Sequence, residues 1–283
     1  MFSLEARGKI NLTLDVLGKR PDGYHEVEMI MQSIELADVL HFSLRDDGEI
    51  VLISEVEGVD DSKDNLIYKA AVKLKDLYKV AKGAQIILEK NIPVAAGLAG
   101  GSADAATTLQ GLNKLWELNL PMEKLCEIGA ELGSDIPFCL RGGTMLAQGR
   151  GEVLSSLPVM PECYVVLAKP NVGVSTAWVY GNYDGDKIVA HPQTKMVVEE
   201  LTKKNLEGVA DLLCNVLESV TIKKYNEIAE LKEKMLEFGA RASLMSGSGP
   251  TVFGLVEDKD KAERLARELE KISSARIIVT RTV

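Results

Sequence analysis

The stretch PVAAGLAGGSADAA, residues 93–106, has the composition of a loop that binds phosphate. Its glycines Gly97, Gly100 and Gly101 let the backbone adopt positive φ and approach a ligand closely. A helical pattern begins near Ser102, and the N–H groups at a helix N-terminus attract anions. The loop has neither the lysine of a P-loop nor the spacing G-x-G-x-x-G. It is predicted to bind phosphate through its backbone; the alternative is a tight turn in which Ser102 caps the helix.

A second loop of small residues, SGSGP at 246–250, lies between two predicted strands. It could also present its backbone to phosphate, although a hairpin turn is the simpler interpretation of this loop alone. A serine hydrolase is excluded, because neither Ser246 nor Ser248 lies in a G-x-S-x-G elbow and no histidine accompanies them.

Three polar residues could act on a phosphoryl group or an alcohol. In the segment 4–16 apolar residues occupy even positions and polar ones odd positions, which predicts a strand with one core face and one polar face. Lys9 and Asn11 share the polar face, although a solvated surface is the usual place for a lysine. Asp135, in GSDIPF, is either a helix N-cap or a carboxylate that accepts the proton of a substrate hydroxyl.

The bulk composition indicates a globular protein. The chain has 283 residues, of which 46% are hydrophobic and 27% charged, and its net charge is −9. This acidity argues against nucleic-acid binding but allows a local basic pocket for an anionic small molecule. The N-terminus lacks the apolar core of a signal peptide and the chain lacks a membrane-spanning apolar run, so we expect a cytoplasmic protein with no membrane contact.

The cysteines and two of the three histidines lie outside any motif. We expect buried, reduced thiols rather than metal ligands, because the cysteines lie in apolar segments without C-x-x-C spacing. His41 and His191 are expected to be structural or exposed. The cysteines are Cys126, Cys139, Cys163 and Cys214.

The periodicity predicts an α+β fold with a boundary between two lobes near 150–160. Predicted strands are 27–36, 38–44, 49–55, 84–90, 164–170, 242–246, 251–256 and 276–282, with a hairpin within 141–157. Predicted helices are 65–83 with a glycine C-cap, 102–121, 121–133 with proline in the first turn, 205–220, 224–238 and 258–273.

Taken together and in order, GKINLTL, PVAAGLAGGSADAA, GSDIPF and SGSGPTVF resemble the motifs of the GHMP kinases, which include galactokinase, homoserine kinase, mevalonate kinase and phosphomevalonate kinase. The resemblance extends over nearly the whole chain. It implies a two-lobed α+β fold with the active site in the cleft between the lobes. Residues 1–155 would form the N-terminal lobe with the glycine-rich phosphate loop, and 156–283 the C-terminal lobe. It also implies a kinase that phosphorylates a small alcohol with ATP and Mg²⁺.

The resemblance assigns roles to individual residues. Lys9 and Asp135 match the catalytic pair, in which the lysine keeps the carboxylate ionised and stabilises charge on the transferring phosphoryl group. Ser102 would contact phosphate or Mg²⁺, as the metal-binding residue of the protein. Asn65 matches a position near the adenine, although a simple helix cap is the alternative. The triphosphate would be wrapped by Pro93, Val94, Ala95, Ala96, Gly97, Leu98, Ala99, Gly100, Gly101, Ser102 and Ala103.

The segment GKRPDGYHE, residues 18–26, is similar to that of one branch of the family, whose substrate carries a cytidine diphosphate group and which serves the non-mevalonate isoprenoid pathway. The resemblance implies that Tyr24 stacks on the base and that His25 hydrogen-bonds its polar edge. Tyr180 would be the second stacking ring, with Trp178 or Tyr183 as alternatives. Asn11 would contact the alcohol portion of the substrate.

Two other functions remain as alternatives. A kinase of the same family could act on homoserine or mevalonate, which the segment 18–26 argues against. A nucleotide-sensing protein could keep the fold without catalysis, but it would not need both Lys9 and Asp135. The oligomeric state is left open.

Overall fold

The computed structural model describes residues 1–54 and 63–283, which form two compact units. The first unit comprises residues 1–8, 36–94 and 99–142, and the second comprises 9–35, 95–98 and 143–283. The predicted α+β class is confirmed, since both units combine runs of helices with mainly antiparallel strand pairs. The predicted lobes are continuous ranges, 1–155 and 156–283, whereas each compact unit consists of several separate segments. The lobe limits therefore stay a prediction. Residue 55 of the predicted strand 49–55 lies outside the described residues.

Two long strands contribute residues to both units. They are β1 (Phe2–Lys19) and β2 (His25–Arg45), and β2 replaces the two shorter strands predicted at 27–36 and 38–44. Between residues 8 and 16 both faces of β1 are buried, so the polar face does not meet solvent as the alternation suggested. This strand therefore carries a row of buried polar side chains, namely Lys9, Asn11, Thr13 and Asp15.

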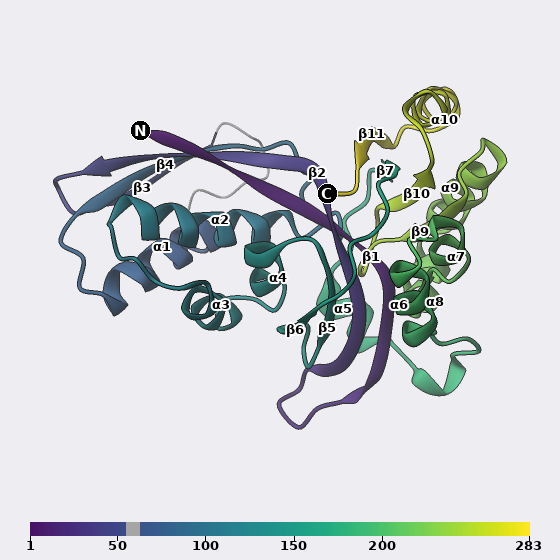
Figure 1. Ribbon diagram of the computed structural model, residues 1–283, viewed down its shortest axis with the longest axis horizontal. Coiled ribbons are helices and arrows are strands. Elements are labelled where there is room, and N and C mark those ends of the chain that lie inside the picture. The colour runs from purple at the N-terminus through teal and green to yellow at the C-terminus, as the bar shows by residue number, and fades with distance from the viewer. Residues whose placement is uncertain (55–62) are drawn as a thin grey trace. The chain divides into compact units, whose positions relative to one another are not determined.

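In the first unit a small sheet is covered by helices. The strand β4 (Gly83–Glu89) pairs antiparallel with the end of β2 and parallel with β3 (Ile50–Ser54). The helices α1 (Leu66–Leu77) and α2 (Gly100–Leu115) pack side by side against this sheet (Figure 1), and α3 (Met122–Ala130) and α4 (Ile136–Arg141) pack on α2. The helix predicted at 65–83 ends at Leu77, with Tyr78 as its C-cap and Lys79 at φ 53°; the predicted glycine C-cap is wrong, because Gly83 is the first residue of β4.

The second unit contains an antiparallel sheet in the order β11 (Arg276–Arg281), β7 (Tyr164–Lys169), β10 (Val252–Val256) and β9 (Ala242–Met245). The helices α9 (Glu227–Glu237) and α10 (Lys259–Ile272) pack on it (Figure 1). The predicted hairpin is confirmed as β5 (Thr144–Gln148) and β6 (Val153–Ser156), which joins the first part of β2. The remaining helices are α5 (Thr176–Gly181), α6 (Thr194–Thr202), α7 (Leu206–Asp211) and α8 (Glu218–Lys224).

The helix predicted at 205–220 is wrong as a single element. It is interrupted by the short strand β8 (Cys214–Asn215), which pairs in parallel with Thr13 and Leu14 of β1. The pairing with β1 outweighs the local helical pattern, because it places the Asn215 side chain among buried backbone groups that need partners.

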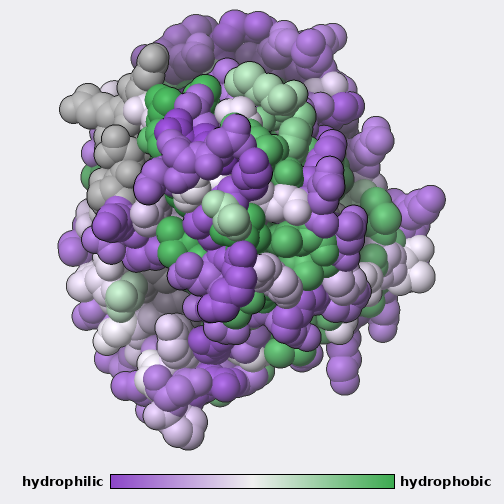
Figure 2. Space-filling view, turned by 90° about the vertical axis from the view of Figure 1, so that its left-hand side faces the viewer, coloured by the Kyte–Doolittle hydropathy of each residue, from purple (hydrophilic) through white to green (hydrophobic). Residues whose placement is uncertain are grey.

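Hydrophilic residues cover most of the face shown in Figure 2, and hydrophobic residues lie in smaller groups among them. Within the described ranges, no helix is both long and apolar enough to cross a bilayer. All four cysteines are free thiols, but only Cys163 is fully buried, so the prediction of burial is wrong for the other three. Burial raises the pKa of the Cys163 thiol to about 11.

Candidate phosphate and nucleotide site

The Lys9 side chain is buried, with only 4% of its surface exposed. Its ammonium donates hydrogen bonds to Asn11 Oδ1 at 2.7 Å and to the Gly97 carbonyl oxygen at 3.0 Å, and its backbone N–H donates to Leu98 O at 3.1 Å. A solvated surface lysine is therefore the wrong interpretation of this residue. The shared side of Lys9 and Asn11 is confirmed; Lys9 lies against the glycine loop, and Asn11 Oδ1 lies 3.5 Å from where a Cβ on Gly247 would be.

The loop SGSGP, residues 246–250, contacts the same Gly97 carbonyl group as Lys9. SGSGP connects β9 and β10 as the predicted hairpin, and Ser246 Oγ donates to Gly97 O at 3.0 Å. Gly97 has φ +74°, and a Cβ on it would lie 2.3 Å from Ser246 O. A Cβ on Gly247 would lie 3.2 Å from Lys9 Nζ. Glycine at both positions thus permits a close approach of two backbones and one cation.

Three residues that were not predicted hold the SGSGP loop. Asn215 Nδ2 donates to the carbonyl oxygens of Met245 and Gly247, both at 2.8 Å. Glu218 Oε1 accepts from the Met245 N–H at 2.9 Å, and Thr221 Oγ1 donates to Ser248 O at 3.1 Å. The sequence signal was the spacing N-x-x-E-x-x-T in NVLESVT, which the predicted continuous helix obscured. Asn215, Glu218 and Thr221 thereby fix the direction of the loop's peptide groups.

The other half of the glycine loop belongs to the first unit and begins α2. This helix starts at Gly100, with Ala99 at the cap position and no side-chain cap, so Ser102 lies in the first turn and is not the cap. The Ala103 N–H is bonded to Ala99 O at 2.9 Å. The N–H groups of the three preceding helical residues have no partner within the helix and can bind an anion.

Two alanines in this loop have backbone conformations that alanine rarely adopts. Ala95 has φ 51° and Ala99 has φ 57°, both in the left-handed region. Such residues cost roughly 1–3 kcal/mol each and persist where the surrounding structure holds them. The loop shape is thus maintained against local backbone preference, which is typical of a ligand-binding segment.

A cation lies directly beside the glycine loop in the first unit. A Cβ on Gly100 would be 2.9 Å from Lys90 Nζ. Lys90 forms ion pairs with Asp38 and with Asp104, the latter at 2.8 Å, and all three side chains are buried. Asp38 Oδ1 also accepts from the Ile92 N–H at 2.7 Å. Lys90 was not predicted, because nothing in the pattern EKNIPV distinguishes it from a surface lysine.

Asp104 is the polar residue of this cluster with an unsatisfied atom. Its side chain is buried, and its Oδ1 is one of the buried atoms that lack a hydrogen-bond partner within the described part of the chain. Burial raises the pKa of the Asp104 carboxyl group to about 7; Lys90 lowers it and Asp38 raises it further. The cluster therefore holds one more acid group than its lysine can neutralise.

Asp135 and Asn65 lie at the starts of helices in the first unit. Asp135 precedes α4, but its side chain makes no capping hydrogen bond, so the N-cap interpretation is wrong for its carboxylate. Asn65 does cap α1, accepting from the Ile67 N–H at 2.8 Å, and its place near the adenine stays a prediction. A Cβ on Gly133 would lie 4.0 Å from Ser102 Oγ, so Ser102 neighbours the turn that carries Asp135.

Aromatic side chains gather around the turn between β1 and β2. The rings of His25 and Tyr180 have centroids 5.2 Å apart and are tilted by 30°. Tyr24 is 53% exposed, and the Arg150 guanidinium lies 5.0 Å from its ring centroid. Trp178 is instead covered by Lys224 at 4.0 Å. Of the three candidate aromatics, the structure places Tyr180 beside His25, and its role in stacking stays a prediction.

The surroundings of His25 favour its neutral form. Burial lowers the pKa of its imidazole, and the nearby positive charge of Lys19 lowers it further. The ring is therefore neutral at pH 7, with one nitrogen that donates and one that accepts.

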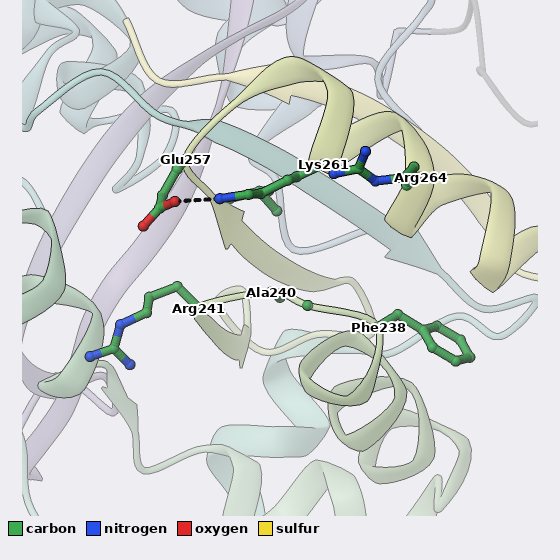
Figure 3. A pocket seen from close by; sticks show the side chains of 8 residues that line it. Phe238, Ala240, Arg241, Glu257, Lys261 and Arg264 are labelled. Carbon is green, nitrogen blue, oxygen red and sulfur yellow. Dashed lines mark hydrogen bonds and ion pairs between the residues drawn. The ribbon is translucent and has the colours of Figure 1, made fainter.

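A separate hollow of about 550 Å³ in the second unit contains none of the predicted site residues. It is lined by the turn after α9, the end of β10 and the first turns of α10 (Figure 3). Two of its cations are already paired, Lys261 with Glu257 at 2.6 Å and Arg241 with Asp211 at 2.7 Å. The third cation that lines the hollow is Arg264 of α10, and none of the lining residues belongs to the glycine loops.

Family models match both parts of the chain. The GHMP kinases N terminal domain matches residues 65–143, and the GHMP kinases C terminal domain matches residues 197–274. The chain therefore belongs to the GHMP kinases.

Its relatives narrow the assignment within that superfamily. The 4-diphosphocytidyl-2-C-methyl-D-erythritol kinase of Geobacillus sp. (strain WCH70) is 53% identical over 93% of this chain and 90% of its own length. The protein of the same name from Bacillus pumilus (strain SAFR-032) is 53% identical over 92% of this chain and 90% of its own. Identity at this level over nearly the full length of both chains groups the sequence with the 4-diphosphocytidyl-2-C-methyl-D-erythritol kinases.

Solved structures agree with this grouping. A crystal structure of 4-(cytidine 5'-diphospho)-2C-methyl-D-erythritol kinase matches with a TM-score of 0.84 and 32% identity, covering 100% of both chains. Homoserine kinase from Cytophaga hutchinsonii matches with a TM-score of 0.76 and 18% identity over 99% of this chain and 94% of that one. The second match shows a common fold alone.

The raised pKa of Asp104 predicts a pH-dependent stability. The folded protein holds this proton up to about pH 7, whereas the unfolded chain releases it near pH 4, so the folded state binds more protons in between. Stability contributed by this group therefore falls as pH rises from about 4 to 7. Between pH 5 and pH 8 we expect the free energy of unfolding, measured with urea, to fall by about 1–3 kcal/mol less in Asp104→Asn than in the wild type.

The slope of stability against pH is the quantity to compare, since the asparagine amide also changes the contact with Lys90. Asp76→Asn is the matched control, because Asp76 is exposed on α1 of the same unit. An Asp104→Asn slope equal to that of the wild type would contradict the assignment.

Proposed function

We propose that this chain transfers the γ-phosphoryl group of ATP to the 2-hydroxyl group of 4-diphosphocytidyl-2-C-methyl-D-erythritol, in the non-mevalonate isoprenoid precursor pathway of the cytoplasm. The observation that carries the proposal is the buried Lys9 ammonium, bonded to the glycine loop in a chain 53% identical to kinases of that name. The catalytic and binding roles that follow are part of the proposal.

Phosphoryl transfer requires positioning and charge stabilisation more than covalent chemistry. The Lys9 ammonium has two of its donors directed to Asn11 Oδ1 and Gly97 O. From that place it would stabilise negative charge on the transferring group, since a desolvated cation acts more strongly than one in water. The α2 N-terminus and the loop backbone would bind the phosphates, and Lys90 would support the loop from behind Gly100.

Asp135 would accept the proton of the substrate hydroxyl as that oxygen attacks phosphorus. Its carboxylate is half-buried and is not used to cap α4, which supports this role. Asn11 would orient the alcohol portion, because its amide lies on the same face of β1 as Lys9. Asn65 would contact the adenine in addition to capping α1.

The cytidine end would be recognised by Tyr24, His25 and Tyr180. The exposed Tyr24 ring offers a stacking surface, and the neutral His25 ring can both donate to and accept from the base edge. Tyr180 beside His25 would complete the base site. In this proposal, the function of the segment GKRPDGYHE is to place Tyr24 and His25 at the turn between β1 and β2.

Mg²⁺ would accompany ATP and neutralise part of its phosphate charge. The described residues include no cluster of three or more His, Cys, Asp or Glu side chains suited to a metal ion. Mg²⁺ prefers oxygen ligands, retains several waters and is often held by substrate phosphates with one or two protein groups. A single protein oxygen is therefore sufficient, and the Ser102 hydroxyl in the first turn of α2 would be that ligand.

Substrate selectivity tests this proposal. We expect ADP release from Mg-ATP with 4-diphosphocytidyl-2-C-methyl-D-erythritol and none above background with homoserine or mevalonate, measured by a coupled assay. Turnover with a smaller alcohol alone would overturn the substrate. Absence of turnover with all three would favour a nucleotide-binding protein without catalysis.

Asp135→Asn should reduce kcat by about 100-fold or more, because the amide cannot accept the proton. The KM for ATP should change little. Glu131→Gln is the matched control, since Glu131 is exposed in the same segment. A near-normal kcat for Asp135→Asn would remove this residue from the mechanism.

Tyr24→Ala should raise the KM for the cytidyl substrate by about 10- to 100-fold, the usual worth of stacking one base on an aromatic ring. Tyr24→Phe keeps the ring and should stay within about threefold of the wild type. Steady-state kinetics with varied cytidyl substrate and saturating ATP measure both. An unchanged KM in Tyr24→Ala would place the base elsewhere.

A further inference from the structure

Arg150 is a charged side chain beside the candidate base site that has no part in the proposed chemistry. It lies in the turn between β5 and β6, where Gly149 has φ +71° and Gly151 has φ +112°. The Gly149 carbonyl oxygen accepts from the Val27 N–H at 2.9 Å, so this turn is attached to the first residues of β2. Tyr24 is the residue directly before β2. The β5–β6 turn therefore lies where it can act on Tyr24.

The turn that carries Tyr24 fixes the backbone of this residue but not its ring. Its carbonyl oxygen accepts from the Arg20 N–H at 2.8 Å, and its own N–H donates to Asp22 Oδ1 at 3.1 Å. Among residues 1–54 and 63–283, its hydroxyl has no hydrogen-bond partner and its ring contacts no other aromatic ring. The residue is 53% exposed. An exposed tyrosine of this kind has several rotamers available, and stacking on a base requires one orientation.

Arg150 provides a contact with the ring itself. The central carbon of its guanidinium lies over the Tyr24 ring, 5.0 Å from the centroid. A cation at this distance is attracted to the electron-rich face of an aromatic ring, and arginine does this more often than lysine. One face of the ring is thus covered by a cation, and the opposite face is the one left for a base.

Glu152 holds Arg150 in this place. Its Oε2 accepts from the Arg150 N–H at 2.7 Å, and its Oε1 lies 3.4 Å from Arg150 Nε. Both side chains are largely buried, with 27% of Arg150 and 22% of Glu152 exposed. A Cβ on Gly149 would lie 3.1 Å from Glu152 Oε2, so glycine leaves room for the carboxylate. Because Glu152 offsets its charge, Arg150 is better suited to hold a neighbouring ring than to bind a phosphate of the substrate.

We propose that Arg150 is a positioning residue for Tyr24: its guanidinium covers one face of the ring, keeps the other face open to the cytosine base, and thereby strengthens binding of the cytidine end without touching it. A ring that is ordered in advance loses less entropy when the substrate binds. The inference rests on the proposed function for its substrate. Its structural part, the restraint of the ring at position 24, can be tested without any substrate.

Arg150→Ala should raise the KM for the cytidyl substrate about three- to tenfold, the effect expected for one cation–π contact and one side chain ordered in advance. We expect kcat and the KM for ATP to stay within about twofold. Arg150→Lys keeps a cation that can lie over the ring and should recover part of the affinity, whereas the uncharged Arg150→Gln should not. Arg267→Ala is the matched control, because Arg267 pairs with Glu263 at 3.9 Å on α10 of the same unit and should leave all three constants unchanged.

A double-mutant cycle with Tyr24→Ala separates positioning from direct contact. If Arg150 acts through the ring, Arg150→Ala should have no further effect on the KM of a protein that already carries Tyr24→Ala. An equal rise in KM in both backgrounds would show that Arg150 contacts the substrate itself, and would overturn the proposal. Equal changes in kcat and in both KM values would also overturn it, because they would indicate general loss of structure.

Time-resolved fluorescence anisotropy separates this inference from the proposed function. The chain has two tryptophans, and Trp116→Phe with Trp178→Phe allows Tyr24→Trp to be the single reporter. An indole ring keeps the cation–π contact. In the substrate-free protein we expect Arg150→Ala to increase the fast, local depolarisation of this reporter, and Arg150→Lys to reduce it again.

Unchanged depolarisation in Arg150→Ala would overturn the positioning role even if the wild type phosphorylates the cytidyl substrate. Greater depolarisation in a protein that does not turn over would support the restraint of the ring and reject the substrate instead.

Discussion

The burial of the Lys9 ammonium is the constraint on which the second unit's loops depend. A lysine at this depth must direct its donors to acceptors, and Asn11 and the Gly97 carbonyl group provide two of them. Gly97 presents that carbonyl group with φ +74°, and a Cβ on Gly247 would crowd both Gly97 O and Lys9 Nζ at 3.2 Å. The loop shapes are thus consequences of where one charge is placed.

A second lysine has the corresponding role in the first unit. Lys90, held between Asp38 and Asp104, lies against Gly100, at the start of α2. The glycine loop is therefore supported in two halves, residues 95–98 by Lys9 and its neighbours and the α2 N-terminus by Lys90. The absence of a lysine within the loop itself is understandable for residues 95–98, because the buried Lys9 supplies positive charge there, whereas the charge of Lys90 is neutralised by Asp38 and Asp104.

Residue patterns predicted the elements well where local periodicity decided them, as in β4, β7, β10, α9 and α10. They failed where distant partners decided the outcome. The apolar–polar alternation of β1 was correct, but burial of its polar face depends on residues far along the chain, such as His191 for Asp15. Asn215 was assigned to a helix because its partners, Met245 and Gly247, are distant in sequence. Lys90 carried no local signal at all, since only the fold brings Asp38 to it.

The chain passes between the two units after Gly8, Glu35, Val94, Leu98 and Gly142. This interleaving constrains folding during synthesis. The first unit is complete once residue 142 has emerged, yet residues 9–35, made much earlier, belong with 143–283. Until residues 143–283 follow, most of β1, with its buried lysine and aspartate, lacks Cys214, Ser246 and His191. A nascent chain must therefore keep this strand, with its alternating apolar residues, without its later partners over more than a hundred residues of synthesis, which exposes it to mispairing and makes early chaperone contact advantageous.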